Sequence, residues 1–213
     1  MPTRVFLLRH AESANPLVFH GAESDVDLSE RGRRQAEAVA RYLAAQRPDV
    51  LVSSGMRRAL ETAGPIAAAC GLAVNVEPAL HERRVGALSG TPTAGAEGVW
   101  PDTLRRWIAG DTAHAPPGAE SFDDIKARVL PVWESWVERA KGQTLAVVAH
   151  GVVIRVLLLS LLVGHSVADW RRLGTIHNAG VSELVRAGAA WEALRVSEVV
   201  AEVRGLPAEP RTK

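Results

Sequence analysis

Two short apolar runs, each followed by a histidine, constrain the fold of this chain more than any other feature. The first run, Val5–Leu8, precedes Arg9 and His10, and the second run, Leu145–Ala149, precedes His150. Unbroken apolar runs of this length are typical of strands that are buried on both faces, as in parallel sheets. Because ligands of open α/β sheets bind at the carboxyl ends of the strands, we expect both histidines at one sheet edge.

Helical and strand-like periodicities alternate along the rest of the chain. Ser29 is an expected helix N-cap, and Ser121 with Asp124 has the spacing of a capping box. Ser54 is expected to cap a further helix, which Pro65 should interrupt. The helix after Ser54 should carry residues 57–63 and kink or restart between Pro65 and Cys70. The other expected helices cover residues 30–46, 102–108, 122–140, 152–163 and 168–173, and the expected strands cover 5–8, 50–52, 72–76, 145–149, 181–185 and 191–196. The alternation predicts one α/β domain over residues 1–204, and residues 205–213 should form a flexible tail.

Composition excludes several classes of protein. A net charge of +1 offers no case for a nucleic-acid or membrane-surface binder. One cysteine excludes an internal disulfide framework and fits a reducing compartment. No secretory signal is visible, and the longest apolar stretch, Val152–Val163, is too short to span a bilayer. We therefore expect a cytoplasmic protein without nucleic-acid or membrane partners, and the composition leaves a homodimer open.

Chemically active side chains gather around the expected sheet edge. Arg58 and His150 both lie where a helix follows a strand, so helix N-terminal amides should face the same edge as Arg9 and His10. Two arginines, two imidazoles and exposed amides favour a phosphate pocket. Glu82 follows in a polar, irregular stretch, where its carboxyl group could protonate a leaving alkoxide. Phosphoryl transfer requires a nucleophile, charge stabilisation and a proton donor, and this set supplies all three.

Metal binding and other enzyme classes are the competing interpretations. The seven histidines form no closely spaced pair, and one cysteine is too few for a thiolate site. The chain contains neither a Walker-type phosphate loop nor a Gly-x-Ser-x-Gly motif. Nucleotide binding of the Walker type and serine-hydrolase chemistry are therefore disfavoured.

Several segments, in the correct order, resemble the motifs of the histidine phosphatase superfamily, branch 1, which includes cofactor-dependent phosphoglycerate mutases. The segments are Arg9-His10-Ala11-Glu12-Ser13, Leu28-Ser29-Glu30, Ser54-Gly55-Met56-Arg57-Arg58, Leu80-His81-Glu82, Gly118-Ala119-Glu120-Ser121 and Ala149-His150-Gly151. The resemblance selects Arg58 rather than Arg57 as a phosphate ligand. It implies a phosphoglycerate mutase-like fold, a three-layer α/β/α sandwich with a mostly parallel central sheet.

The resemblance also implies a role for each site residue. His10 would be phosphorylated, and Glu82 would act as proton donor and then as base. The residues implied to hold the phosphate are Arg9, Arg58, His150, Ser13, Asn15 and Gly151. No metal and no cofactor is implied.

Two residues depart from the family pattern. Ala11 replaces the usual glycine, and its methyl group could crowd a close backbone approach. Asn15 lies one position earlier than the family's usual phosphate-loop asparagine and is followed by Pro16.

Three functions remain open at this stage. Mutases of the family carry Tyr-Gly and Gly-Leu-Asn-Lys soon after the proton-donor segment, and Thr91–Trp100 matches neither. We predict a metal-independent phosphomonoesterase that acts on a small phosphorylated metabolite through a phosphohistidine. The alternatives are a phosphoglycerate mutase-type transfer and a regulatory protein that binds phosphate without turnover. Residues 91–120 should form a variable insert over the active site, and the sequence does not specify the substrate.

Overall fold

A six-stranded sheet forms the centre of the computed structural model, which describes residues 3–93, 98–188 and 190–206. The strands are β1 (Arg4–Arg9), β2 (Val50–Ser54), β3 (Val74–Glu77), β4 (Thr144–Ala149), β5 (Val181–Ala187) and β6 (Ala190–Glu198). Their spatial order is β3-β2-β4-β1-β5-β6. Strands β1 to β4 pair in parallel, whereas β5 runs antiparallel to both β1 and β6. The carboxyl ends of the four parallel strands therefore share one edge.

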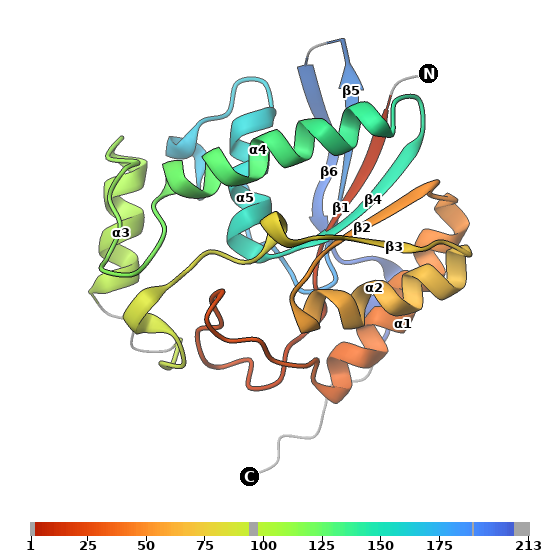
Figure 1. Ribbon diagram of the computed structural model, residues 1–213, viewed down its shortest axis with the longest axis horizontal. Helices are drawn as coiled ribbons and strands as arrows, with labels where there is room; N and C mark the ends of the chain where they lie inside the picture. Colours follow the sequence, from red (N-terminus) through yellow and green to blue (C-terminus); the bar gives the residue numbers. More distant parts are fainter. Residues whose placement is uncertain (1–2, 94–97, 189, 207–213) are drawn as a thin grey trace.

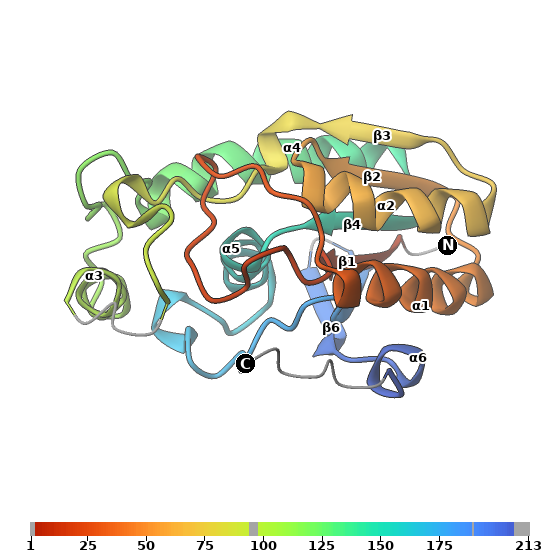
Figure 2. The ribbon, with the colours of Figure 1, turned by 90° about the horizontal axis from the view of Figure 1, so that it is seen from below.

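Helices cover both faces of this sheet and make the three layers that the resemblance implies. The helices are α1 (Glu30–Gln46), α2 (Arg57–Cys70), α3 (Val99–Ile108), α4 (Phe122–Arg139), α5 (Gly151–Leu161) and α6 (Ala201–Arg204). Helices α1, α2 and α6 lie on one face, and α4 and α5 lie on the other (Figure 1). Helix α3 lies away from the sheet (Figure 2), and its Trp107 is buried in the same cluster as α4 and α5. None of the helices in the described ranges is both long and apolar enough to cross a membrane.

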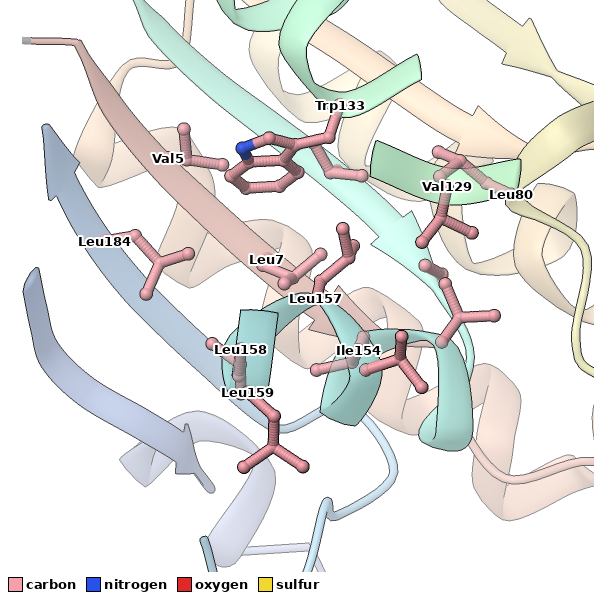
Figure 3. Packing of buried hydrophobic residues seen from close by; sticks show 14 of the residues in the cluster. Val5, Leu7, Leu80, Val129, Trp133, Ile154, Leu157, Leu158, Leu159 and Leu184 are labelled. Atoms are coloured by element: carbon pink, nitrogen blue, oxygen red, sulfur yellow. The ribbon is translucent and has the colours of Figure 1, made fainter. Parts of the chain in front are cut away.

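Alternating side chains of the central strands divide the hydrophobic core into two clusters. Val5 and Leu7 of β1 face the cluster of α4 and α5, whereas Phe6 and Leu8 face that of α1 and α2. Figure 3 shows the first cluster, in which Trp133 of α4 packs near β1. Strands β1 and β4 are buried on both faces because helices cover each side, which explains their unbroken apolar runs. The sequence-based fold prediction is confirmed.

The sequence predicted the N-terminal caps of α1 and α4 correctly, but two other predictions about helices are wrong. Ser29 caps α1 by accepting the backbone N–H of Gly32 at 2.9 Å, and Ser121 with Asp124 forms a full capping box at α4. The expected helix at 168–173 is wrong, because only a 3₁₀ turn, Val167–Asp169, forms there. Pro65 lies inside a continuous α2 rather than interrupting it. The buried face of α2 against the core offsets the backbone hydrogen bond that proline removes.

Candidate active site

The expected residues gather in one pocket at the carboxyl edge of the parallel strands. In the sheet register Arg9 of β1 pairs with Ala149 of β4, and Ser54 of β2 pairs with Glu77 of β3. The pocket has a volume of about 420 Å³, which is within the usual range for small-molecule sites. Its lining includes Arg9, His10, Ser13, Arg58, Glu82 and Gly151. Six of the eight residues expected from sequence therefore line one cavity.

His10 has the protonation and geometry of a nucleophile. The ring is 4% exposed, and Nδ1 lies 2.7 Å from the carbonyl oxygen of Ala11. Because a carbonyl oxygen only accepts, Nδ1 must carry the proton, and Nε2 keeps its lone pair. Burial lowers the pKa of His10 well below 6.5, and the charges of Arg9 and Arg58 lower it further. A neutral imidazole with a free Nε2 is the form that attacks phosphorus.

His150 is fully buried beside His10. The two ring centroids lie 5.1 Å apart, and His150 Nε2 lies 2.8 Å from Ser54 Oγ. Burial, and then the neighbouring charge of His10, lowers the pKa of His150 well below 6.5. Nδ1 of His150 has no partner among the described residues. If the Ser54 hydroxyl donates to Nε2, Nδ1 carries the proton and becomes an unsatisfied donor for an anion.

Arg9 and Arg58 bring two buried guanidinium groups to the pocket. Nη1 of Arg9 donates to the carbonyl oxygen of Ile176 at 2.7 Å, and Nη1 of Arg58 donates to that of Ser24 at 2.8 Å. These backbone anchors hold the two side chains in place. Burial lowers the pKa of each arginine, but a guanidinium remains charged at neutral pH. In the described part of the chain Nε of each has no partner, so both groups keep donors for an anion.

The start of α2 differs from the expectation. Ser54 lies at the end of β2 and contacts His150, so it does not cap the helix, and Met56 occupies the cap position without a side-chain bond. The backbone N–H of Arg57 donates to Asp25 at 2.8 Å. That amide is therefore not available to phosphate, contrary to the expectation for this helix. The Arg57 side chain is exposed and pairs with Asp27, and it does not line the pocket.

Glu82 links the pocket rim to the start of α5. Its Oε1 accepts the backbone N–H of Arg83 at 2.9 Å, and its Oε2 accepts that of Val152 at 3.3 Å. The carboxyl group lines the same pocket as His10. It is therefore held by two amides at a position from which a bound ester can be reached.

The remaining expected ligands divide into two groups. Ser13 and Gly151 line the pocket, and Gly151 lies beside the Arg9 side chain. Asn15 is exposed and does not line the pocket. Its backbone oxygen instead accepts Nε2 of His20 at 3.0 Å. The structure does not bring Asn15 to the other candidates.

Ala11, which replaces the family's usual glycine, packs in an apolar environment. It is fully buried in the cluster of α1 and α2, and its backbone N–H donates to Thr62 Oγ1 at 3.0 Å. Its φ is not in the left-handed region, so the backbone does not demand glycine here.

Sequence reasoning missed part of the pocket. Ser54 is a partner of His150, and Arg83, Trp100, Arg155 and Trp170 also line the cavity. Arginine pairs recur along this chain, so position 83 carried no distinguishing signal. Thr93 and Trp100 come from the expected insert 91–120, of which residues 94–97 lie outside the described residues.

The arrangement suits phosphoryl transfer. A neutral imidazole is suited to nucleophilic attack, two guanidinium groups keep N–H donors that suit phosphate oxygens, a second imidazole lies buried beside the first, and a carboxyl group lines the same pocket. Across residues 3–93, 98–188 and 190–206, no group of three or more histidine, cysteine or acidic side chains is placed to hold a metal ion.

Comparison with known proteins places the chain in a family. Glucosyl-3-phosphoglycerate phosphatase of Mycolicibacterium vanbaalenii is 33% identical over 189 residues, which cover 85% of this chain and 83% of that protein. Phosphoserine phosphatase 1 of Hydrogenobacter thermophilus is 35% identical over 160 residues, which cover 75% of this chain and 76% of that protein. The solved structure of a mycobacterial glucosyl-3-phosphoglycerate phosphatase matches with a TM-score of 0.81 at 30% identity, covering 93% of this chain and 100% of that one. The family model of the histidine phosphatase superfamily (branch 1) matches residues 5–199, and the chain belongs to that superfamily, as its motifs predicted.

Proposed function

We propose that this protein is a metal-independent phosphomonoesterase that hydrolyses a small phosphorylated metabolite through a phosphohistidine at His10. The observation that carries the proposal is the His10 tautomer. Its Nδ1–H is held by the Ala11 carbonyl, which leaves the Nε2 lone pair free in a pocket with two guanidinium groups. The relatives named above are phosphatases, which supports water rather than a second substrate site as the final acceptor.

The reaction has two steps. In the first, His10 Nε2 attacks phosphorus, the P–O ester bond breaks, and the leaving oxygen takes the proton of the Glu82 carboxylic acid. In the second, the Glu82 carboxylate removes a proton from water, whose oxygen attacks phosphorus as the P–N bond breaks. The electron pair of that bond returns to Nε2, and inorganic phosphate leaves. Arg9, Arg58 and His150 stabilise the phosphoryl oxygens in both steps.

The proposal extends to the setting of the protein. A single cysteine fits a reducing compartment, which supports a cytoplasmic location. A homodimer stays a prediction, which light scattering on the purified protein would decide.

Trapping the covalent intermediate tests the proposed function. Purified enzyme in EDTA should hydrolyse 4-nitrophenyl phosphate. Rapid mixing with labelled substrate and an alkaline stop should trap phosphohistidine on the peptide that contains His10. His10→Ala should remove both label and turnover, whereas His165→Ala, outside the pocket, should keep them. Activity that vanishes in EDTA and returns with one divalent ion would refute the metal-independent mechanism, and label on another residue would refute the role of His10.

A further inference from the structure

Thr62 carries a fully buried hydroxyl group that takes no part in the proposed reaction. It lies on α2, one helical turn after Arg58, and it does not line the pocket. Its Oγ1 donates to the carbonyl oxygen of Arg58 at 2.7 Å and accepts the backbone N–H of Ala11 at 3.0 Å. Because a carbonyl oxygen only accepts and an amide only donates, the direction of both hydrogen bonds is fixed. Thr62 therefore joins α2 to the chain that follows β1.

Gln35 holds the next peptide unit from the neighbouring helix. The residue lies on α1 and is buried, and its Oε1 accepts the backbone N–H of Glu12 at 2.9 Å. Helices α1 and α2 pack against each other on one face of the sheet (Figure 2), and Ala11 is buried in the cluster that both helices form. The two helices thus hold the peptide units on either side of Ala11.

The carbonyl group of Ala11 is the acceptor that orients the His10 ring, with its oxygen 2.7 Å from Nδ1. Peptide units are planar, so the direction of this carbonyl depends on the two planes that meet at Ala11. The bond to Thr62 holds the first plane, and the bond to Gln35 holds the second. Fixing both planes fixes the carbonyl group and therefore the ring nitrogen that carries the proton.

The peptide unit between His10 and Ala11 is also held at its other end. The carbonyl oxygen of His10 accepts Nδ2 of Asn178 at 3.1 Å and the backbone N–H of Ala179 at 3.3 Å. The N–H and C=O groups of a trans peptide point in opposite directions, so Thr62 and Asn178 hold this unit from opposite sides. A buried amide without an acceptor is unfavourable. Loss of the Thr62 hydroxyl should therefore turn this peptide unit away from its native orientation.

We propose that Thr62 and Gln35 are positioning residues, which fix the Ala11 carbonyl so that His10 keeps its proton on Nδ1 and its lone pair on Nε2. Neither side chain lines the pocket, so both act through the backbone and not on the substrate. With the carbonyl displaced, the neutral ring would hold its proton on either nitrogen, and only the form with a free Nε2 would attack phosphorus. This inference rests on the proposed phosphohistidine function.

Thr62→Val tests the proposal, because it keeps the shape of the side chain and removes the hydroxyl. Nitrogen NMR of the histidine-labelled protein should show His10 changing from the Nδ1–H tautomer to a mixture of both tautomers. The kcat for 4-nitrophenyl phosphate should fall by about 10- to 100-fold, the effect expected when a reacting group is slightly displaced. The inhibition constant of phosphate should change little, because the side chains of Arg9 and Arg58 keep their backbone acceptors.

Thr103 on α3 provides a matched control. It is also buried, and its Oγ1 donates at 2.7 Å to the carbonyl oxygen of Val99, the same four-residue spacing as in Thr62 and Arg58. Thr103 does not line the pocket, so Thr103→Val should leave the His10 tautomer and kcat unchanged. Thr62→Ser keeps the hydroxyl and should restore the native tautomer and most of kcat.

Gln35→Met removes the acceptor on the other side of Ala11 and should shift the His10 tautomer in the same direction as Thr62→Val. It also decides the question if Thr62→Val does not fold. An unshifted tautomer in either variant that folds would overturn the proposal. A loss of kcat that Thr62→Ser does not restore, or a native His10 that carries its proton on Nε2, would overturn it as well.

The tautomer is measured without turnover, so this inference and the proposed function fail separately. If the native enzyme hydrolyses no phosphomonoester but Thr62→Val still shifts the His10 tautomer, the proposed function fails and the positioning role stands. If the native enzyme hydrolyses phosphomonoesters through His10 but Thr62→Val leaves the tautomer unchanged, the positioning role fails and the proposed function stands.

Discussion

Glu120 and Arg128 form a bidentate ion pair that holds the chain segment on either side of Glu82. Arg128 Nε and Nη2 each lie 2.9 Å from one carboxylate oxygen of Glu120. Nη1 of Arg128 also donates to the carbonyl oxygens of Ala79 and His81, at 2.6 and 3.0 Å. Glu120 in turn accepts the backbone N–H of Arg84 at 2.8 Å. One partly buried pair therefore fixes the backbone before and after the proposed proton donor.

Glu120→Gln should consequently impair proton donation more than phosphate binding. We expect kcat for alkyl phosphates to fall by about tenfold and the inhibition constant of phosphate to change little, because the change displaces Glu82 and leaves Arg9 and Arg58 in place. The free energy of unfolding should fall by about 1–3 kcal/mol, the cost of disrupting a hydrogen-bonded charge. Steady-state kinetics and urea unfolding measure both effects. Glu138→Gln, which removes an exposed pair with Lys141, is the matched control.

The same substitution should make stability less sensitive to acid. Burial raises the pKa of Glu120, but the hydrogen bonds from Arg128 and Arg84 outweigh it and hold the pKa below its usual value. A carboxylate with a lowered folded-state pKa contributes stability above its unfolded pKa, and this contribution is lost as pH falls through the folded pKa. The free energies of unfolding of the native protein and of Glu120→Gln should therefore differ most at neutral pH and become equal below about pH 4. If the two proteins differ in unfolding free energy by the same amount at neutral pH and below about pH 4, the pair does not stabilise the charged form of Glu120.

Arg58→Ala should weaken phosphate binding far more than Arg57→Ala. Arg58 is 1% exposed and lines the pocket, whereas Arg57 is exposed and pairs with Asp27. The loss at Arg58 should be about 10- to 100-fold in the inhibition constant for phosphate or vanadate, since charge-assisted bonds are worth about 1.5–3 kcal/mol. Competitive inhibition assays give both values. Equal losses in the two variants would contradict the assignment of Arg58 as the ligand.

Replacement of Glu82, the proposed general acid, should slow the reaction most for esters with poor leaving groups. Glu82→Gln should slow phosphoryl transfer from alkyl esters by ~10²–10⁴-fold, the usual contribution of general acid catalysis. A nitrophenolate leaves without a proton, so 4-nitrophenyl phosphate should lose much less in the phosphorylation step. Single-turnover measurements resolve that step, and Glu30→Gln, at an exposed site on α1, should leave both substrates unaffected. A loss of the same size for both esters would argue against proton donation by Glu82.

The two active-site imidazoles should stay neutral in mildly acidic solution. Burial lowers the pKa values of His10 and His150 well below 6.5, and the guanidinium groups of Arg9 and Arg58 lower them further. Nitrogen-detected NMR should therefore show both rings uncharged at about pH 6, where an ordinary histidine is mostly protonated. Added phosphate should raise both pKa values, because an adjacent anion favours the charged ring. Protonation of both rings at that pH in the free enzyme would contradict this prediction.

These imidazoles also predict how stability depends on pH. Above the unfolded pKa of about 6.5 they are neutral in both states and add no pH dependence. Below it the unfolded chain binds protons that the folded protein excludes, so stability falls as pH falls. His10→Gln should unfold with a smaller loss of stability between about pH 7 and 5 than the native protein. A loss as large as that of the native protein would show that His10 takes up its proton without unfolding.

The sequence by itself determined the fold class and most of the candidate site. The runs at β1 and β4 are unbroken because both strands are covered on two faces, and their polar ends must lie where the sheet opens to solvent. His10 and His150 were therefore recognisable from local pattern alone. Helix α1 could also be predicted from the sequence, because its cap at Ser29 and its apolar stripe are both local signals.

Only the tertiary structure decided which polar groups meet. Ser54 contacts His150 across 96 residues of chain, and Pro65 stays helical because α2 packs on the core. Arg83 and Arg84 are adjacent and identical in sequence, yet one stacks on Trp100 inside the pocket and the other is exposed. Burial and long-range partners set the energy of a charge, and neither is encoded in the residues next to it.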